Sequence, residues 1–183
     1  SAASDVYKRQ EVTLWMRNEE AAKEINDTNI NSRYLPNLTL GSNLTATSEM
    51  ADISDSGIII FCVPSDAFRG VSDLASSYIK EESFLVTATK GVEKDGFSLM
   101  SNILADYFPR NAIGVLSGPN LAEEIASNHL SGTVIASENK ILAQTIIEGL
   151  STEFFRVYEN DDPYGVELSL IHISEPTRQE AIS

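Results

Sequence analysis

The chain has 183 residues, of which 42% are hydrophobic and 22% are charged, a globular composition with enough apolar material for a core. Thirteen Lys and Arg against 27 Asp and Glu give a net charge of −14. We expect no nucleic-acid partner, because neutralising phosphates requires clustered Lys and Arg. The sequence shows no membrane span, no disulfide framework and no Cys and His cluster for a metal, and we expect a cytoplasmic protein.

The two ends differ in character from the middle of the chain. Residues 1–10 (SAASDVYKRQ) have no hydrophobic period, and residues 169–183 (SLIHISEPTRQEAIS) follow an ordered-looking segment with an abrupt change of composition. We interpret both segments as non-native scars from cloning or sequencing adapters and exclude them from the fold prediction. Residues 11–168 are then the informative part.

The first predicted elements are short. Residues 12–16 are β-branched and aromatic and predict a strand, after which Asn18 is placed to cap a helix. A loop is expected at Tyr34-Leu35-Pro36. Residues 44–47 predict another strand, and Ser48 is expected to cap a short helix that continues to Asp52.

An apolar run over residues 58–63 is too short for a helix and predicts a strand buried on both faces, with Cys62 as a buried thiol. The helix that follows Pro64 carries apolar residues spaced by three and four, namely Phe68, Val71, Leu74 and Tyr78. Later segments repeat this alternation, with strands over 83–89, 112–116, 133–136 and 154–158 and helices over 97–108, from 121, and over 140–150. The pattern predicts a doubly wound, mostly parallel α/β sheet, with the last strand turning antiparallel at an edge.

Ligands of open α/β sheets bind beyond the carboxyl ends of the strands. Pro64, Lys90 and Gly118 each follow a predicted strand, and Gly118 lets the backbone approach a ligand closely. Asn120 and Glu123 fit a capping box, which opens a helix N-terminus that favours anions. Singly, these residues are more often a strand end, a surface lysine or a turn; their joint order favours a binding site.

Six motifs occur in order along residues 11–168: EVTLW-x-R, YLP, VPS, ATKG, LSGP-x-x-A-x-E-x-A and FRVYENDDPYGVEL. In this order they resemble the bacterial-type NAD(P)-dependent glycerol-3-phosphate dehydrogenases. The resemblance implies a Rossmann-type cofactor domain, NAD or NADP as cofactor, and a helical C-terminal domain. It further implies reversible hydride transfer between NAD(P)H and dihydroxyacetone phosphate, giving sn-glycerol 3-phosphate for glycerophospholipid synthesis, with a homodimer as the full-length state.

The same resemblance assigns roles to single residues. Lys90 of ATKG is implied to lie between cofactor and substrate, as a catalytic residue that binds both. Gly118 and Asn120 are implied to contact the substrate, although Asn120 stands where the family is expected to have Thr or Ser. The implied cofactor contacts are Arg17, Pro64 and Ala122.

Arg17 follows the first predicted strand, where NAD-specific sites usually carry an acid. A guanidinium there can bind a 2′-phosphate through two parallel hydrogen bonds, whereas Glu19 and Glu20 oppose that charge. We therefore expect use of both cofactors with a lean towards NADPH.

Two family features do not occur in this chain. Residues 1–10 do not contain the G-x-G-x-x-G turn, and Ile173 falls near the position of the family's general acid/base lysine. We interpret the chain as an internal fragment whose sheet lacks its first strand and whose helical C-terminal domain is absent. Such a fragment is expected to have no measurable dehydrogenase activity and marginal stability.

Two alternatives remain open at this point. One is another two-domain Rossmann reductase of hydroxy acids, in which ATKG together with SGP is not expected. The other is a non-enzymatic α/β binding module such as a phospho-receiver. A receiver requires an acidic pair after its first strand, whereas Asp52 and Asp55 precede the apolar strand here.

Overall fold

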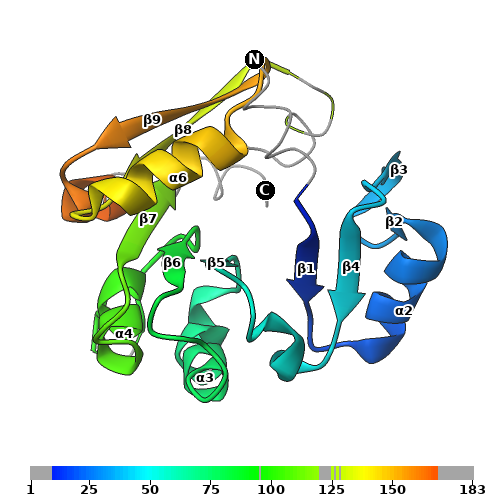
Figure 1. Cartoon of the computed structure of the whole chain (residues 1–183), viewed down its shortest axis with the longest axis horizontal. Helices are drawn as coiled ribbons and strands as arrows, with labels where there is room; N and C mark the ends of the chain where they lie inside the picture. Colours follow the sequence, from blue (N-terminus) through cyan, green and yellow to red (C-terminus); the bar gives the residue numbers. More distant parts are fainter. Residues whose placement is uncertain (1–9, 95, 120–124, 126, 128, 169–183) are drawn as a thin grey trace, which may run out of the picture. The chain divides into compact units, whose positions relative to one another are not determined.

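The computed structural model describes residues 10–94, 96–119, 125, 127 and 129–168 (Figure 1). The chain divides into two compact units, with the boundary between Asp55 and Ser56. Each unit has its own sheet and its own packed residues.

A parallel pair of strands, β1 (Val12–Trp15) and β4 (Leu44–Thr47), forms the centre of the first unit. The connecting helix α2 (Glu19–Thr28) packs Ala22 and Ile25 against β4. Asn18 Oδ1 accepts a hydrogen bond from the amide of Ala21 at 2.9 Å, which confirms the predicted N-cap.

Two predictions for the first unit are wrong. Leu35 and Pro36 belong to strand β3 (Leu35–Thr39), which pairs antiparallel with β2 (Ile30–Asn31). Proline is tolerated in β3 because this strand pairs on one side only. The short 3-10 helix η1 (Met50–Ile53) begins after Glu49 and has no side-chain cap, so Ser48 does not have the predicted role.

The second unit contains a sheet in the order β5 (Ile58–Phe61), β6 (Phe84–Thr87), β7 (Ile113–Ser117), β8 (Ser131–Ala136) and β9 (Phe155–Asn160). β5, β6 and β7 are parallel, β8 runs antiparallel to β7, and β9 is parallel to β8. The mostly parallel α/β sheet is confirmed. The reversal of direction comes one strand earlier than predicted, at β8.

Helices cover both faces of this sheet. Phe61 of β5 contacts Phe68 of α3 (Ser65–Ala75), with ring centroids 5.5 Å apart. Val86 of β6 pairs with Ile60 and packs into the cluster formed with α6 (Lys140–Leu150). Because successive strand residues point to opposite faces, α3 and α6 lie on opposite sides of the sheet (Figure 1).

Three local predictions for this unit need correction. Cys62 is exposed, because β5 ends at Phe61 and is the edge strand of the described sheet. Helix α3 buries Phe68, Ser72 and Ala75, whereas Leu74 is 51% exposed. Helix α4 (Met100–Tyr107) starts later than residue 97, because Leu99 still bridges to Val92 across a hairpin. None of the described helices has both the length and the apolar composition that crossing a membrane requires.

Candidate functional site at the strand ends

Three predicted site residues meet at one edge of the second unit's sheet. Phe61, Thr87 and Val115 are direct neighbours across the parallel strands β5, β6 and β7. One predicted residue lies three positions beyond each of them, namely Pro64, Lys90 and Gly118. The structure therefore brings these three positions together at the carboxyl ends of the strands, where open α/β sheets bind ligands.

The turn after β6, which carries Lys90, is held by hydrogen bonds to the end of β5. Thr89 Oγ1 donates to the carbonyl of Val63 at 2.7 Å, and the amide of Ala88 donates to the carbonyl of Phe61 at 2.9 Å. Gly91 follows with φ +107°, a left-handed conformation that favours glycine. A side chain at Gly91 would lie 3.6 Å from Ser65 Oγ, so this turn lies against the first turn of α3.

Lys90 is exposed, and none of the described acidic side chains lies within ion-pair distance of it. Two other cations of this unit form ion pairs: Lys94 Nζ lies 3.0 Å from Asp66 Oδ2, and Arg69 Nε lies 2.5 Å from Glu93 Oε1. An ammonium without a partner in the described part of the chain is suited to an anionic ligand.

The N-terminus of α3 opens at the same edge. Pro64 is the N-cap of this 11-residue helix and provides no side-chain cap. Amides of an uncapped first turn point out of the helix and favour a negative charge. The exposed Lys90, the Gly91 turn packed against α3 and this helix N-terminus together suit an anionic nucleotide or a sugar phosphate.

The other predicted residues belong to the first unit or fall outside the described part of the chain. Arg17 is exposed at the carboxyl end of β1 in the first unit, beside the Asn18 cap. Asn120 and Ala122 lie outside the described residues, as does the capping box with Glu123. Gly118 is buried directly after β7.

Sequence analysis missed Glu167, which is only 5% exposed. Its carboxyl accepts hydrogen bonds from the amide of Ser101 at 3.1 Å and from Ser101 Oγ at 2.5 Å. Burial raises the pKa of Glu167 above its usual range, although the bonds from Ser101 oppose this shift. A single acid between the apolar Val166 and Leu168 is the signal that could have indicated a buried carboxyl group.

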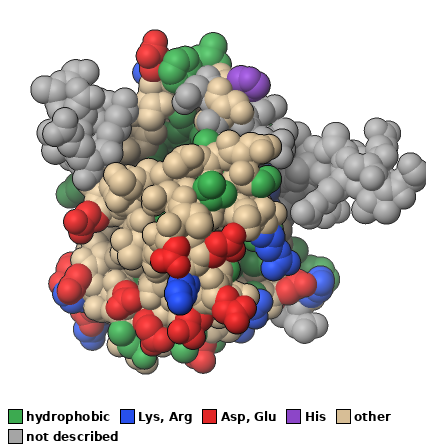
Figure 2. Space-filling view, turned by 90° about the vertical axis from the view of Figure 1, so that its right-hand side faces the viewer, with side chains coloured by type: hydrophobic (Ala, Val, Ile, Leu, Met, Phe, Trp, Pro, Cys, Tyr) green, Lys and Arg blue, Asp and Glu red, His purple; other side chains and the backbone are tan. Residues whose placement is uncertain are grey.

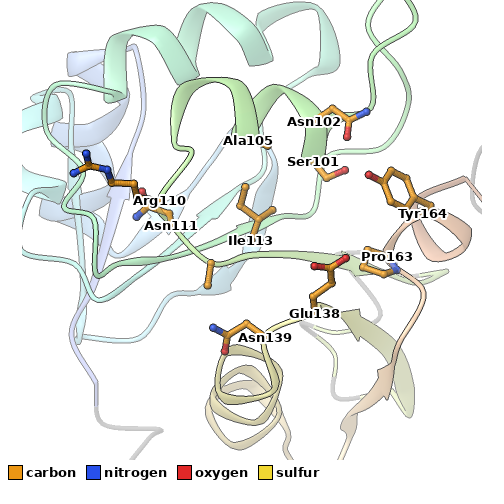
Figure 3. Close-up of a pocket in the computed structure, with 11 residues that line it drawn as sticks. Ser101, Asn102, Ala105, Arg110, Asn111, Ile113, Glu138, Asn139, Pro163 and Tyr164 are labelled. Atoms are coloured by element: carbon orange, nitrogen blue, oxygen red, sulfur yellow. The ribbon is translucent and has the colours of Figure 1, made fainter.

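A pocket of about 540 Å³ lies beside α4, between the start of β7 and the segments that follow β8 and β9. Figure 3 shows Tyr164 extending towards Ser101 and Asn102 of α4 across this pocket. None of the predicted site residues lines it. The pocket is therefore separate from the strand-end site.

On the face shown in Figure 2, acidic side chains spread over the lower part with basic side chains between them. On this face the negative charge does not form a single cluster.

The fold and the strand-end site define a Rossmann-type α/β domain. A family model described as the N-terminus of NAD-dependent glycerol-3-phosphate dehydrogenase matches residues 2–143. The chain therefore belongs to the NAD-dependent glycerol-3-phosphate dehydrogenase family.

Curated relatives agree with this family. A glycerol-3-phosphate dehydrogenase [NAD(P)+] of Alcanivorax borkumensis is 44% identical over 158 residues, which cover 86% of this chain and 46% of the relative. The corresponding protein of Acinetobacter baumannii is 45% identical over 156 residues, covering 85% of this chain and 43% of the relative. The chain thus spans less than half the length of these relatives.

Two solved glycerol-3-phosphate dehydrogenases have a similar fold. Glycerol-3-phosphate dehydrogenase of Coxiella burnetii matches with a TM-score of 0.84 and 33% identity, covering 91% of this chain and 51% of that one. The Plasmodium falciparum glycerol-3-phosphate dehydrogenase matches with a TM-score of 0.83 and 25% identity, covering 91% and 49%. A ketopantoate reductase of Ralstonia eutropha, at 14% identity and a TM-score of 0.62, shares the fold alone.

Proposed function

We propose that residues 11–168 form part of the dinucleotide-binding domain of an enzyme that transfers a hydride between NAD(P)H and dihydroxyacetone phosphate. The observation that carries this proposal is the position of Lys90, which is exposed, has no acidic partner among the described residues, and lies on a turn after β6 that is hydrogen-bonded to the end of β5. The printed names of the curated relatives support the reaction and the choice of NAD or NADP.

The residues at the strand ends fit an anionic cofactor and a phosphorylated substrate. When bound, the nicotinamide cofactor supplies or accepts the hydride. The ammonium of Lys90 offsets negative charge on the substrate's carbonyl oxygen or phosphate. The first turn of α3, where Lys94 offsets the charge of Asp66, adds backbone amides, and Gly118 has no side chain to keep a ligand from its backbone.

Replacing Lys90 with Ala in a full-length dehydrogenase that carries residues 11–168 tests this role. Removing one charge aimed at developing negative charge costs roughly 10²–10³ in rate, so kcat/KM for dihydroxyacetone phosphate should fall by that factor. The matched control is Lys94→Ala, because Lys94 lies four residues on and pairs with Asp66. Near wild-type efficiency of Lys90→Ala, with an unchanged circular dichroism spectrum, would return Lys90 to a surface role.

We also propose that Arg17 binds the 2′-phosphate of NADPH, so that both cofactors are used with a lean towards NADPH. In the same full-length enzyme, Arg17→Ala should raise the KM for NADPH by roughly tenfold or more, because a charge-assisted hydrogen bond contributes about 1.5–3 kcal/mol. The KM for NADH should hardly change. Lys23→Ala, an exposed cation on α2, is the control. Equal changes for both cofactors would contradict the 2′-phosphate role.

The proposed product, sn-glycerol 3-phosphate, places the enzyme in the supply of glycerophospholipid synthesis in the cytoplasm. We propose a homodimer as the state of the full-length enzyme. The chain's net charge of −14 disfavours a nucleic-acid partner.

A further inference from the structure

The helical turn formed by residues 163–168 follows β9 and is built by its own local contacts. Asp162 Oδ1 accepts from the amide of Gly165 at 2.9 Å, and the carbonyl of Asp162 accepts from the amide of Val166 at 3.1 Å. A side chain at Gly165 would meet the Asp162 carboxylate, which would have to move from its place in this turn. These two hydrogen bonds fix the backbone of the turn that carries Val166 and Glu167.

Glu167 joins this turn to α4. Leu99 is the N-cap of α4 and provides no side-chain cap. The Glu167 carboxyl takes over that function, because both of its oxygens accept hydrogen bonds from Ser101 in the first turn of α4. The two residues are 66 positions apart in the sequence. With 5% exposure, this contact is shielded from competing water.

A second bond joins the same turn to the strand-end site. Ser117 Oγ donates to the carbonyl of Val166 at 3.1 Å. Ser117 is the last residue of β7 and directly precedes Gly118, which is buried. The residue next to Glu167 is thus hydrogen-bonded to the end of β7, directly before Gly118.

We propose that Glu167 is a positioning residue, which fastens turn 163–168 to α4 and, through the adjoining Ser117–Val166 bond, holds the backbone at Gly118 in place for the phosphorylated substrate. This inference rests on the proposed function. Glu167 acts through Gly118 and touches neither substrate nor cofactor.

The first experiment measures position without relying on activity. Hydrogen–deuterium exchange of the 183-residue chain should show faster exchange in Glu167→Ala over residues 98–103, 113–119 and 163–168, by roughly tenfold to a hundredfold. Exchange over α6 should not change. In Glu167→Gln the amide oxygen can accept from Ser101 N and the NH₂ can donate to Ser101 Oγ, so exchange should stay close to wild type. Glu153→Ala, an exposed acid of the same unit, is the control.

The second experiment uses the full-length dehydrogenase that carries residues 11–168. Glu167→Ala should raise the KM for dihydroxyacetone phosphate by roughly tenfold, with a smaller change in the KM for NADH, and Glu167→Gln should restore it. Unchanged exchange in Glu167→Ala would overturn the proposal, and so would faster exchange with unchanged KM values. A wild-type enzyme that oxidises no NAD(P)H with this substrate would overturn the proposed function and the positioning role with it. If the wild-type enzyme is active but Glu167→Ala changes neither the exchange nor the KM values, only the positioning role is removed.

Discussion

Buried polar side chains in the second unit fall into two groups that differ in their hydrogen bonds. Ser83, Ser137 and Glu167 are buried and have partners: Ser83 Oγ donates to the carbonyl of Ser56, and Ser137 Oγ to that of Ile113. Ser72 and Thr133 are also buried, but their hydroxyls form no hydrogen bond with any described group. An unpaired buried hydroxyl loses its hydration without compensation, so these two groups should respond to mutation in opposite directions.

Ser72→Ala should stabilise the chain by about 1 kcal/mol, because it removes an unpaired hydroxyl and adds a better helix former in α3. Urea unfolding gives the free-energy difference. Ser76→Ala is the matched control, because Ser76 Oγ donates to the carbonyl of Asp73 at 2.7 Å and is exposed. A loss of stability in Ser72→Ala would show that its hydroxyl has a partner.

Glu167 makes stability depend on pH in an unusual direction for an acid. Because burial raises its pKa in the folded state, the folded chain keeps this proton to a higher pH than the unfolded chain does. Its contribution is therefore fully present below the unfolded value of about 4.5 and is lost as pH rises through the folded pKa.

Glu167→Gln, which cannot titrate, should gain stability relative to wild type as pH rises from about 4 to 7. Chemical unfolding of both proteins across this range measures the difference. Taking the difference removes the opposing contribution of Glu93, whose pKa is lowered by its hydrogen bond from Arg69. A constant difference across the range would mean that the Glu167 pKa is the same in both states.

At the scale of elements, helix α6 is capped by one side chain at its N-terminus and buries one face against the sheet. Asn139 Oδ1 accepts from the amide of Leu142 at 3.0 Å and caps the helix. One face of α6 then places Leu142, Ala143 and Ile146 in the main cluster on the sheet. The amide of Asn139 donates to Ser137 Oγ, so the cap itself is anchored to the end of β8.

Asn139→Ala should destabilise the chain by about 1 kcal/mol, the usual cost of losing an N-cap acceptor. Asn139→Asp keeps the acceptor and adds a negative charge at the helix N-terminus, so its stability should match or exceed wild type. Thermal unfolding of wild type and the two variants measures these differences in stability. Equal stability of the Ala variant and wild type would show that α6 is held by its packing alone.

At the scale of the whole molecule, the net charge of −14 is offset locally by ion pairs. Several link segments far apart in sequence, such as Arg110 with Glu81 and Lys140 with Glu159. Exposed pairs of this kind each contribute about 0–1 kcal/mol. Lys90 has no acidic partner within ion-pair distance among the described residues, and the same holds for Arg17, Lys23, Arg33 and Arg156. What distinguishes Lys90 is its place on the turn after β6, which is hydrogen-bonded to the end of β5.

Most of the elements and part of the candidate site followed from the sequence alone. The Asn18 cap, the span of α6 and the parallel strands β5 to β7 were predicted, because short-range hydrogen bonds and hydrophobic period depend on neighbouring residues. Pro64, Lys90 and Gly118 were predicted together, since the carboxyl ends of parallel strands lie at one edge of a sheet.

Only the tertiary structure decided the remaining features. The reversal at β8 and the exposure of Cys62 depend on which strands become neighbours, and strand sequences carry no direction signal of their own. Glu167 meets Ser101 across 66 residues of sequence, and no local pattern links the two. Capping residues and hydrophobic period, which are local, therefore determined most of the helices and strands and the order of residues at the strand ends. Strand direction, and the contact by which the Glu167 carboxyl group joins turn 163–168 to α4, depend on packing between segments far apart in the sequence.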